Sequence, residues 1–340
     1  MSARTAVVAV TAAVLAGGGT AYAAGAPVAG VSVGGAGVTW GALRYVALEA
    51  PKGTAVAQID RATGTVNGFA ALRGAWGIPQ VAFDGSTAGI SAGGQTLVLA
   101  QNRQVFYPRH SRFALVNPVK MRVDRIVTLP GAFFFDAIAP DGSRMYLIQL
   151  TSPRHVLRYA VRAYDLRHDR LVPGAIVDTT EPDERMTGMP MARATSADGV
   201  WAYTLYYKPT GAYFVHALNT QAGIARCIDL PPLRSQNTPR LAVDGGRLDV
   251  LDGGHALVAV DRATFGVTRS PEPVAQSAPK PVKPATSQAP ARRSPDGAPV
   301  WLAVPAGLVL AGLVLLVVRR RRPARGGRSG GAAAGAPSGP

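Results

Sequence analysis

Short apolar segments that alternate with polar positions, and that end at Gly, Asp, Asn or Pro, recur between residues 37 and 270. A period of two residues is typical of β-strands, and no stretch of this region has the 3.6-residue period of an amphipathic helix. The first such segments lie in residues 37–48. The pattern therefore predicts an all-β region over residues 37–270.

A turn that contains an Asp-Gly pair follows an apolar segment at four places in this region. The pairs are Asp84-Gly85, Asp141-Gly142, Asp198-Gly199 and Asp244-Gly245. A predicted strand follows each turn; these strands cover residues 96–100, 145–149, 201–206 and 248–251. The repeat length is roughly 50 residues, and with four strands per repeat it is typical of a β-propeller blade.

Predicted hairpins alternate with these turns along the chain. They cover residues 56–66, 163–171, 215–223 and 258–266, with a weaker copy at residues 114–117. Five hairpins predict five blades, and the alternative is a sixth, degenerate blade within residues 89–113. A β-sandwich is the other architecture that regular short strands allow.

Two of these segments resemble a known repeat. Ala139–Tyr146 is similar to the S-P-D-G-x-x-x-Y-V turn, and Asp60–Gly64 to the D-x-x-T-G hairpin, of the extracytoplasmic YVTN, TolB and WD40-like propeller repeats. Asp261–Gly266 departs from the hairpin motif by one inserted residue. The resemblance covers residues 37–270 and implies a β-propeller, but it says little about function, because such repeats occur in proteins of many activities.

The N-terminus predicts a secretory signal peptide over residues 1–26. A short basic start precedes an apolar run and then small residues, with cleavage expected after Ala23 or Ala26. The alternative is an uncleaved anchor, although the apolar run is shorter than the roughly 20 residues that a span requires. No Cys follows the run, which excludes lipoprotein processing.

The C-terminal part predicts a single membrane span from Val300 to Val318. This uncharged run would be about 28 Å long as a helix, close to the thickness of a bilayer core. Arg319, Arg320, Arg321 and Arg322 follow it directly and form a stop-transfer signal, with a short Arg-rich tail over residues 319–340. The positive-inside rule then predicts a single-pass type I protein of the cell membrane with its C-terminus in the cytoplasm. No L-P-x-T-G motif precedes the span, so attachment to the cell wall is not expected.

Residues 271–299 are rich in Pro and predict a semi-rigid stalk between the β region and the span. The chain has 36 Lys and Arg against 20 Asp and Glu, a formal net charge of +16. More than half of this excess lies in the two ends and the stalk, so the β region is only mildly basic and is not a nucleic-acid-binding polycation. The abundance of Ala, Gly, Arg and Pro is typical of high-GC genomes, as in actinobacteria.

The sequence offers few candidates for chemistry. Gly89–Gly93 matches G-x-S-x-G, but a strand is predicted after it where a nucleophile elbow needs a helix. The five His residues at 110, 155, 168, 216 and 255 lack metal-ligand spacing, and Glu181, Asp183 and Glu184 lack a Ca²⁺-binding ladder. Cys227 is the single Cys, which excludes an intrachain disulfide and favours a small buried apolar role.

Two groups of side chains permit either a structural or a binding role. Trp201, Tyr203 and Leu205 are expected on one face of a strand, where packing between blades is favoured over a carbohydrate-stacking platform. Several arginines fall in predicted loops or near strand ends and allow a basic surface for an anionic polymer or lipid, although the composition alone accounts for many of them. They are Arg103, Arg109, Arg112, Arg154, Arg158, Arg162, Arg167 and Arg170.

These patterns predict a non-enzymatic binding or scaffold module outside the membrane. No catalytic residue, metal site or cofactor is predicted, no nucleic-acid partner is expected, and the expected partner is an envelope protein or an anionic wall polymer. The alternative is a hydrolase or lyase built in the centre of the propeller, similar to lactonase-type propellers. Such an enzyme would need acidic or His residues on the inner strands, whereas the repeats place their Asp mainly in turns.

Overall fold

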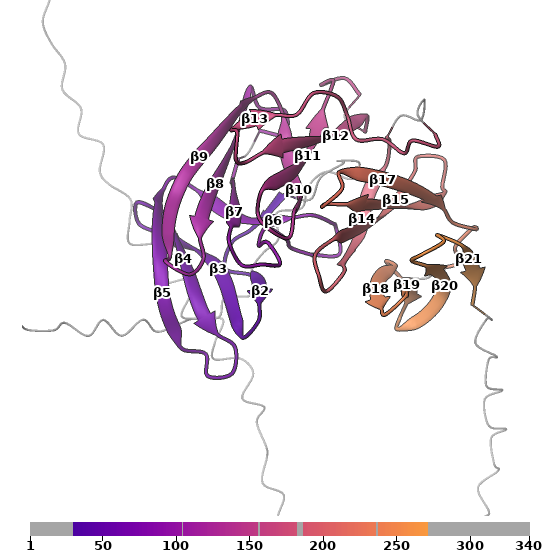
Figure 1. Ribbon diagram of the computed structural model, residues 1–340, viewed down its shortest axis with the longest axis horizontal. Helices are drawn as coiled ribbons and strands as arrows, with labels where there is room; N and C mark the ends of the chain where they lie inside the picture. The colour runs from indigo at the N-terminus through magenta and orange to yellow at the C-terminus, as the bar shows by residue number, and fades with distance from the viewer. Residues whose placement is uncertain (1–29, 104, 156, 182–185, 236, 271–340) are drawn as a thin grey trace, which may run out of the picture. The chain divides into compact units, whose positions relative to one another are not determined.

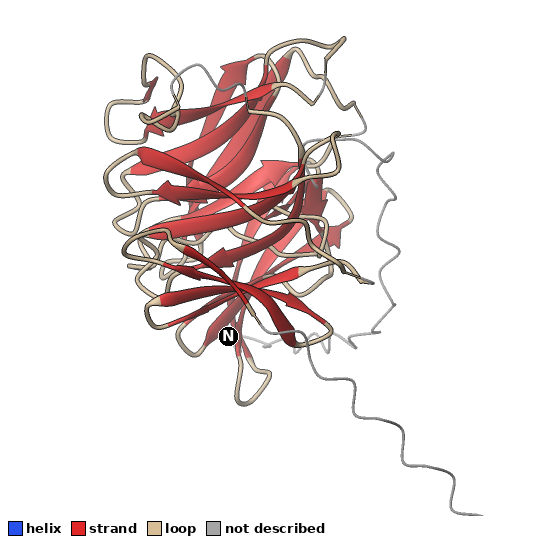
Figure 2. Cartoon of the chain, turned by 90° about the vertical axis from the view of Figure 1, so that its right-hand side faces the viewer, coloured by secondary structure: helices blue, strands red, loops and turns tan. Residues whose placement is uncertain are grey.

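The computed structural model describes residues 30–103, 105–155, 157–181, 186–235 and 237–270. The chain divides into two compact units, Met1–Ala275 and Gln276–Pro340, and all of the described residues belong to the first. Within this described part the chain forms strands, turns and loops and no helix (Figure 2). The expected all-β region is therefore confirmed.

The described strands form five antiparallel sheets, each built from consecutive strands of the chain (Figure 1). The first sheet contains β2 (Val38–Trp40), β3 (Leu43–Ala50), β4 (Gly53–Asp60) and β5 (Val66–Arg73). The second contains β6 (Trp76–Gln80), β7 (Leu97–Gln101), β8 (His110–Asn117) and β9 (Arg122–Pro130), with β1 (Gly30–Ser32) added beside β6. The third contains β10 (Phe133–Ile138), β11 (Arg144–Leu150), β12 (Tyr159–Asp165) and β13 (Arg170–Leu171).

The last two sheets have the same four-stranded, up-and-down order. The fourth contains β14 (Met189–Thr195), β15 (Trp201–Tyr207), β16 (Tyr213–Asn219) and β17 (Ile224–Asp229). The fifth contains β18 (Arg240–Asp244), β19 (Arg247–Asp252), β20 (His255–Asp261) and β21 (Val267–Arg269). The described part of residues 89–113 supplies β7 and the start of β8 in the second sheet, and does not form a sixth sheet.

Apolar clusters fill the space between consecutive sheets. Each cluster combines residues of two neighbouring sheets, because a single sheet cannot cover its own apolar faces. Examples, in chain order, are Tyr45 with Leu99, Phe113 with Leu147, Val161 with Phe214, and Leu205 with Val250. Repeated four-stranded meanders that pack on one another in sequence make the fold propeller-like.

The five hairpins share one side-chain device. An Asp or Asn at the end of the third strand accepts hydrogen bonds through Oδ1 from the backbone N–H groups two and three residues later, at 2.8–3.1 Å. These residues are Asp60, Asn117, Asp165, Asn219 and Asp261. The bonds satisfy backbone donors that the tight turn leaves without a strand partner. The weak copy near residues 114–117 is therefore a complete member of the set.

The residue four positions after each of these Asp or Asn residues has a positive φ. Gly64 and Gly223 occupy this position in two hairpins, and Met121, Asp169 and Phe265 in the other three. The backbone bond from Phe265 N–H to Asp261 O matches the bond from Gly64 N–H to Asp60 O. The expected insertion in Asp261–Gly266 is wrong: Phe265 takes the place of Gly64, and Gly266 follows it.

The segment Gly89–Gln95, which we call the hub loop, connects several sheets. Trp40 Nε1 at the end of β2 donates to Ala92 O at 2.8 Å, and Gly93 N–H donates to Pro140 O at 2.8 Å. A Cβ atom added at Gly199 would lie 2.7 Å from Ala92 Cβ, so the turn after β14 also packs closely on this loop. The Gly-rich loop thus serves to hold the turns of four sheets together.

Several predictions concern residues outside the described part of the chain. They are the signal peptide over 1–26 with Ala23 and Ala26, the stalk over 271–299, the span from Val300 to Val318, the arginines 319–322, and Asp183 and Glu184. Among the residues that the structure does describe, none belongs to a helix of the length and apolarity that crossing a bilayer would require.

Candidate functional site

A cavity of about 550 Å³ lies between the first strands of several sheets. Strands β2, β10 and β14 and the segment Thr87–Ala92 line it. This volume is within the range of about 300–1,000 Å³ that is usual for small-ligand sites. We call it the central cavity.

The repeat explains at which end the cavity opens. In an up-and-down sheet the first and third connections lie at one end. Here these connections include the Asp-Gly turns of the third, fourth and fifth sheets and all five hairpins, and we call this end the turn end. Most exposed residues of the lining, namely Thr39, Gly41, Thr195 and Ala197, belong to this end, whereas exposed Ala36 precedes β2. The lining is therefore most exposed toward the turn end.

A buried ion pair forms part of the cavity wall. Arg193 of β14 donates through Nη2 to Asp136 Oδ1 and, at 3.0 Å, to the backbone oxygen of Asp136. Both side chains are only 4% exposed, and Arg193 Nε has no hydrogen-bond partner among the described residues. Burial, and to a smaller extent the Asp136 carboxylate, raise the pKa of the neighbouring Tyr206. The pair joins the third and fourth sheets at the cavity wall.

A β-bulge directs Asp136 to this position. In the pairing of β10 with β11, Phe135 lies opposite Leu147 and Ala137 opposite Tyr146, so Asp136 is the extra residue. A bulge interrupts the regular alternation of side chains and can turn one of them toward a neighbouring element. The Asp136 carboxylate consequently meets an arginine of the next sheet.

Asp136 and Arg193 are not among the functional residues predicted from the sequence. A signal was present, because each is a single charged residue inside an otherwise apolar segment, Phe133–Ile138 and Met189–Ala194. A lone charge in a buried strand needs a partner of opposite charge. The sequence does not show which partner, because 57 positions separate the two residues.

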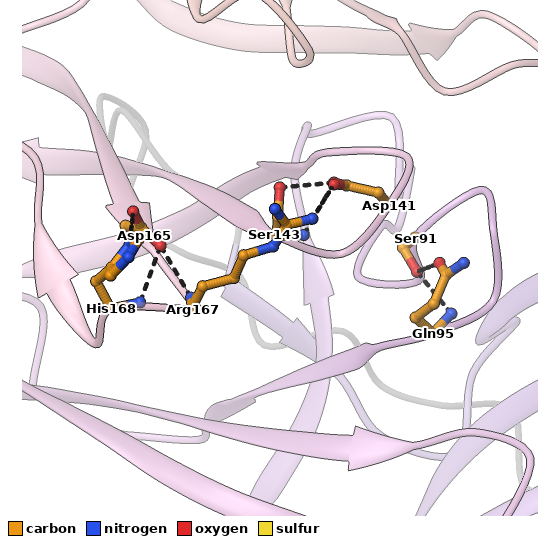
Figure 3. A network of polar contacts seen from close by, with 7 residues as sticks. All are labelled: Ser91, Gln95, Asp141, Ser143, Asp165, Arg167 and His168. Carbon is orange, nitrogen blue, oxygen red and sulfur yellow. Dashed lines mark hydrogen bonds and ion pairs between the residues drawn. The ribbon is translucent and has the colours of Figure 1, made fainter.

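Ser91 of the G-x-S-x-G segment has a structural role. It is fully buried, and its Oγ accepts hydrogen bonds from Gln95 N–H at 3.0 Å and Thr96 N–H at 3.1 Å (Figure 3). The strand β7 follows it, as expected. The hydroxyl thus stabilises the hub loop instead of being exposed as a nucleophile.

Aspartates of the turn end take part in local networks (Figure 3). Asp141 Oδ1 accepts from the Ser143 hydroxyl at 2.6 Å, and its Oδ2 accepts from Arg167 Nη2 at 2.7 Å. The Ser143 hydroxyl is the main cause that lowers the pKa of Asp141. The His168 ring, 2.8 Å from Asp165 Oδ2, is the main cause that lowers the pKa of Asp165 to about 2.

We expect the free energy of unfolding of Asp165→Asn to decrease less between pH 5 and pH 2 than that of the wild type. Because the folded pKa of Asp165 is below its ordinary value of about 3.9, the charged form favours folding above pH 4, and this contribution is lost as the pH falls toward 2. Unfolding midpoints measured between pH 5 and pH 2 should therefore fall less steeply for Asp165→Asn. The converse variant, Asn219→Asp, places an acid in an equivalent turn and should steepen the slope. Equal slopes for both variants would contradict the assignment.

The other candidate residues lie apart from the central cavity. No group of three or more His, Cys, Asp or Glu in the described residues is arranged to hold a metal ion. His216 is buried, whereas His110, His155, His168 and His255 are exposed. Cys227 is partly buried, and its backbone N–H donates to Asp178 Oδ2 at 2.8 Å.

Trp201, Tyr203 and Leu205 pack between the fourth and fifth sheets. They belong to one apolar cluster with residues of β19 and β20, and Trp201 meets Phe265 edge-on with ring centroids 5.5 Å apart. The Tyr203 hydroxyl accepts from Arg262 Nε at 3.0 Å. The expected packing between blades is confirmed for these side chains.

The arginines proposed for a basic surface divide into separate groups. Arg167 and Arg170 lie at the turn end, and Arg162 bonds Gln149 and the backbone oxygen of Val172. Arg112 lies over the Trp76 ring, 5.7 Å from its centroid. Arg103, Arg109, Arg154 and Arg158 lie in loops at the opposite end of the sheets.

Comparison with known proteins gives matches of low sequence identity among solved structures. No family model matches the sequence, and no curated protein matches it. Among solved structures, TolB from Acinetobacter baumannii is 12% identical, with a TM-score of 0.36, over 66% of this chain and 50% of that one. The Dos1 propeller is 10% identical, with a TM-score of 0.39, over 68% and 56%. The mitotic checkpoint complex is 13% identical, with a TM-score of 0.41, over 76% and 74%.

Proposed function

We propose that residues 37–270 form a five-bladed β-propeller that acts as a non-enzymatic binding or scaffold module. In this proposal the module is extracytoplasmic, reaches the membrane through the stalk over residues 271–299, and is held there by the span from Val300 to Val318. Its ligand is a protein or a polymer of the cell envelope, part of which enters the central cavity.

The observation that carries the proposal is the lining of the central cavity. Backbone groups, hydroxyls, small side chains and a few larger apolar ones such as Trp40 and Ile138 surround it, and the charged groups in its lining, Asp136 and Arg193, neutralise each other. General acid–base or nucleophilic catalysis needs a group that is free to exchange a proton or attack a substrate. A cavity with paired charges and a mixed polar and apolar lining is better suited to hold a ligand than to transform it.

A variant that fills the cavity tests this function. We expect Thr195→Arg, which places a long side chain at the exposed edge of the cavity, to abolish capture of the native ligand by the tagged full-length protein. Purification from native membranes in mild detergent, with mass spectrometry and sugar analysis, would identify the ligand. Thr128→Arg is the matched control, because Thr128 is exposed on β9 and does not line the cavity.

Two outcomes would contradict the proposal. If Thr195→Arg retains the same ligand as the wild type and as Thr128→Arg, the cavity is not the binding site. If a chain of residues 270–340 alone captures that ligand, the β region is not the binding module. Fractionation of the same preparation measures membrane anchoring separately, so a failure of anchoring would not be mistaken for either result.

Asp136 gives the enzymatic alternative one specific observation in its favour. It is an acidic residue at the wall of the central cavity, as a propeller-based hydrolase or lyase would require. Activity would need its carboxylate to be released from Arg193. Turnover of lactones or uronate polysaccharides by the wild type, lost in Asp136→Asn, would favour this alternative.

A further inference from the structure

The ends of the five sheets differ in the chemistry of their connections. Connections between second and third strands, together with those that join one sheet to the next, lie opposite the turn end, and we call this the loop end. Asparagine and aspartate side chains that cap turns gather at the turn end. Because the repeat uses its acids as turn caps, negative charge is concentrated at that end.

Several cations at the turn end have acidic partners, although Arg61, Lys120 and Arg170 form no ion pair with a described residue. Ion pairs join Arg167 to Asp141 at 2.7 Å, Arg125 to Asp169 at 2.9 Å and Arg122 to Asp124 at 2.9 Å. Arg247 and Asp249 form a further pair at 2.9 Å. The positive charge of the turn end is therefore largely compensated.

At the loop end, seven exposed cations form no ion pair with any residue that the structure describes. We call them the loop-end cations; they are Lys52, Arg73, Arg109, Arg154, Arg158, Arg240 and Arg269. Of the acids at this end, Asp178 is buried against Arg226, and Asp229 pairs with Lys208. Glu49 and Glu181 are exposed, Asp252 accepts from Asn237 Nδ2, and Asp84 lines a pocket together with Arg240. The described acids near this end are therefore fewer than the described cations.

Arg103 lies partly buried in a loop of the loop end, near another guanidinium. Burial and then the nearby guanidinium of Arg112 lower the pKa of Arg103, which lies in the same loop as Arg109. This loop packs on the third sheet, because the Tyr107 hydroxyl donates to Leu150 O at 3.3 Å. Arg109 is thus brought toward Arg154 and Arg158 of the adjacent β11–β12 loop.

We propose that the loop end binds a linear polyanion whose repeating units carry phosphate or carboxylate groups. The loop-end cations are spread over the first, second, third and fifth sheets, so a small anion would meet few of them, whereas a chain of anionic units could cross several loops. Guanidinium groups suit such ligands because each can form two parallel hydrogen bonds to a phosphate or carboxylate. This surface lies at the end opposite the turn end, and its function is separate from that of the central cavity.

An anionic lipid bilayer is the other partner that the charges would allow, but the loop end fits a bilayer less well than a polymer. Membrane-binding surfaces combine cations with apolar side chains that enter the bilayer. Among the described residues of the loops that join second to third strands, Val105 is the single exposed large apolar side chain. The last strand, β21, ends at this same end, so the chain beyond Ser270 starts here and the predicted stalk would separate the loop end from the bilayer.

The test uses the full-length protein in nanodiscs of neutral phosphatidylcholine, with fluorescent long-chain polyphosphate as the probe and anisotropy as the readout. The test variant combines Arg109→Gln, Arg154→Gln and Arg158→Gln. A control variant combines Lys120→Gln, Arg122→Gln and Arg170→Gln, which removes the same net charge from the turn end. We expect at least a tenfold loss of affinity in the first and less than a twofold change in the second.

Salt dependence supplies an independent measure. If about five anionic groups are engaged, raising the salt from about 50 to about 200 mM should weaken wild-type binding roughly 100-fold, by analogy with single-stranded nucleic acids. The triple loop-end variant should show a shallower slope. Undetectable binding by the wild type, or an equal loss in both triple variants, would overturn the proposal.

Discs of anionic phosphatidylglycerol distinguish a polymer from a lipid. If the loop end binds the polymer, polyphosphate should still bind there, more weakly, and Arg109, Arg154 and Arg158 should still determine the affinity. The opposite result has two parts: polyphosphate no longer binds in anionic discs, and the anionic discs protect the loops of the loop end from hydrogen exchange in the wild type but not in the triple variant. This result would assign the surface to lipid and overturn the proposal. Because the cavity variant Thr195→Arg leaves the loop end unchanged, this result does not depend on the function proposed for the cavity.

Discussion

Replacing Arg193 with Met is expected to lower the free energy of unfolding of the β region by about 3–5 kcal/mol, because it leaves a buried carboxylate without its cation. Asp136 is 4% exposed, so its carboxylate has few contacts with water that could compensate for the loss of the guanidinium. Urea unfolding of a chain of residues 30–270, followed by Trp fluorescence, would measure the change.

A double-mutant cycle separates the pair from its surroundings. The single variant Asp136→Leu should also be strongly destabilising, since it leaves Arg193 buried and unpaired. The double variant Asp136→Leu/Arg193→Met removes both charges and should recover most of the lost stability, because apolar replacement of a buried ion pair is often neutral or better. Additive effects of the two substitutions would show that the groups do not interact, and would contradict the geometry described here.

The same double variant connects stability with function. If it folds and the ligand of the central cavity is no longer captured, the pair is retained for recognition and not for stability. A folded double variant that captures the ligand as well as the wild type would restrict recognition to the hydroxyl and backbone groups of the lining.

Local repeats made much of the fold predictable from the sequence. The Asp-Gly turns and Asx hairpins are local, because an Asp or Asn side chain bonds backbone groups two or three residues away, and residue identity is enough to predict them. Asn117 shows the limit of matching letters: its hairpin lacks the D-x-x-T-G sequence and still makes the same bonds. Phe265 shows a second limit. It occupies the position with positive φ that Gly64 occupies in the first hairpin, so a search for Gly at that position assigns the wrong register to the last hairpin.

Contacts between distant segments were not predictable in the same way. Strand β1 has only three residues, and its pairing of Gly30 with Gln80 depends on tertiary packing and not on local propensity. The Asp136–Arg193 pair depends on a bulge and on the packing of one sheet against the next. A sequence pattern can show that a buried charge needs a partner, but the fold decides which one it meets.

The charge difference between the two ends follows from combining both kinds of information. The sequence shows which Asp and Asn residues belong to the repeated turns, and sheet topology then places the hairpin residues and Asp141, Asp198 and Asp244 at the turn end. The loop-end cations belong to connections of different lengths and have no shared motif. Their common location becomes evident only when the strands are assigned.

Replacing Leu205 with Ala is expected to lower the free energy of unfolding by about 2–5 kcal/mol, because it leaves a cavity in a closely packed cluster. Leu205 is fully buried, and its cluster includes Leu248, Val250 and Val258 of the fifth sheet. In a repeat architecture each unit depends mainly on its neighbours, so the fifth sheet should lose the most protection.

Hydrogen exchange measured by mass spectrometry would locate the effect of Leu205→Ala. Amides of β19 and β20 should exchange faster, while those of β3 and β4 in the first sheet should change little. Leu48→Ala is the matched control: Leu48 is 39% exposed on β3, so its substitution should cost under about 1 kcal/mol. Uniform deprotection of all five sheets by Leu205→Ala would show instead that the β region unfolds as a single cooperative unit, and would contradict the dependence of the fifth sheet on the fourth.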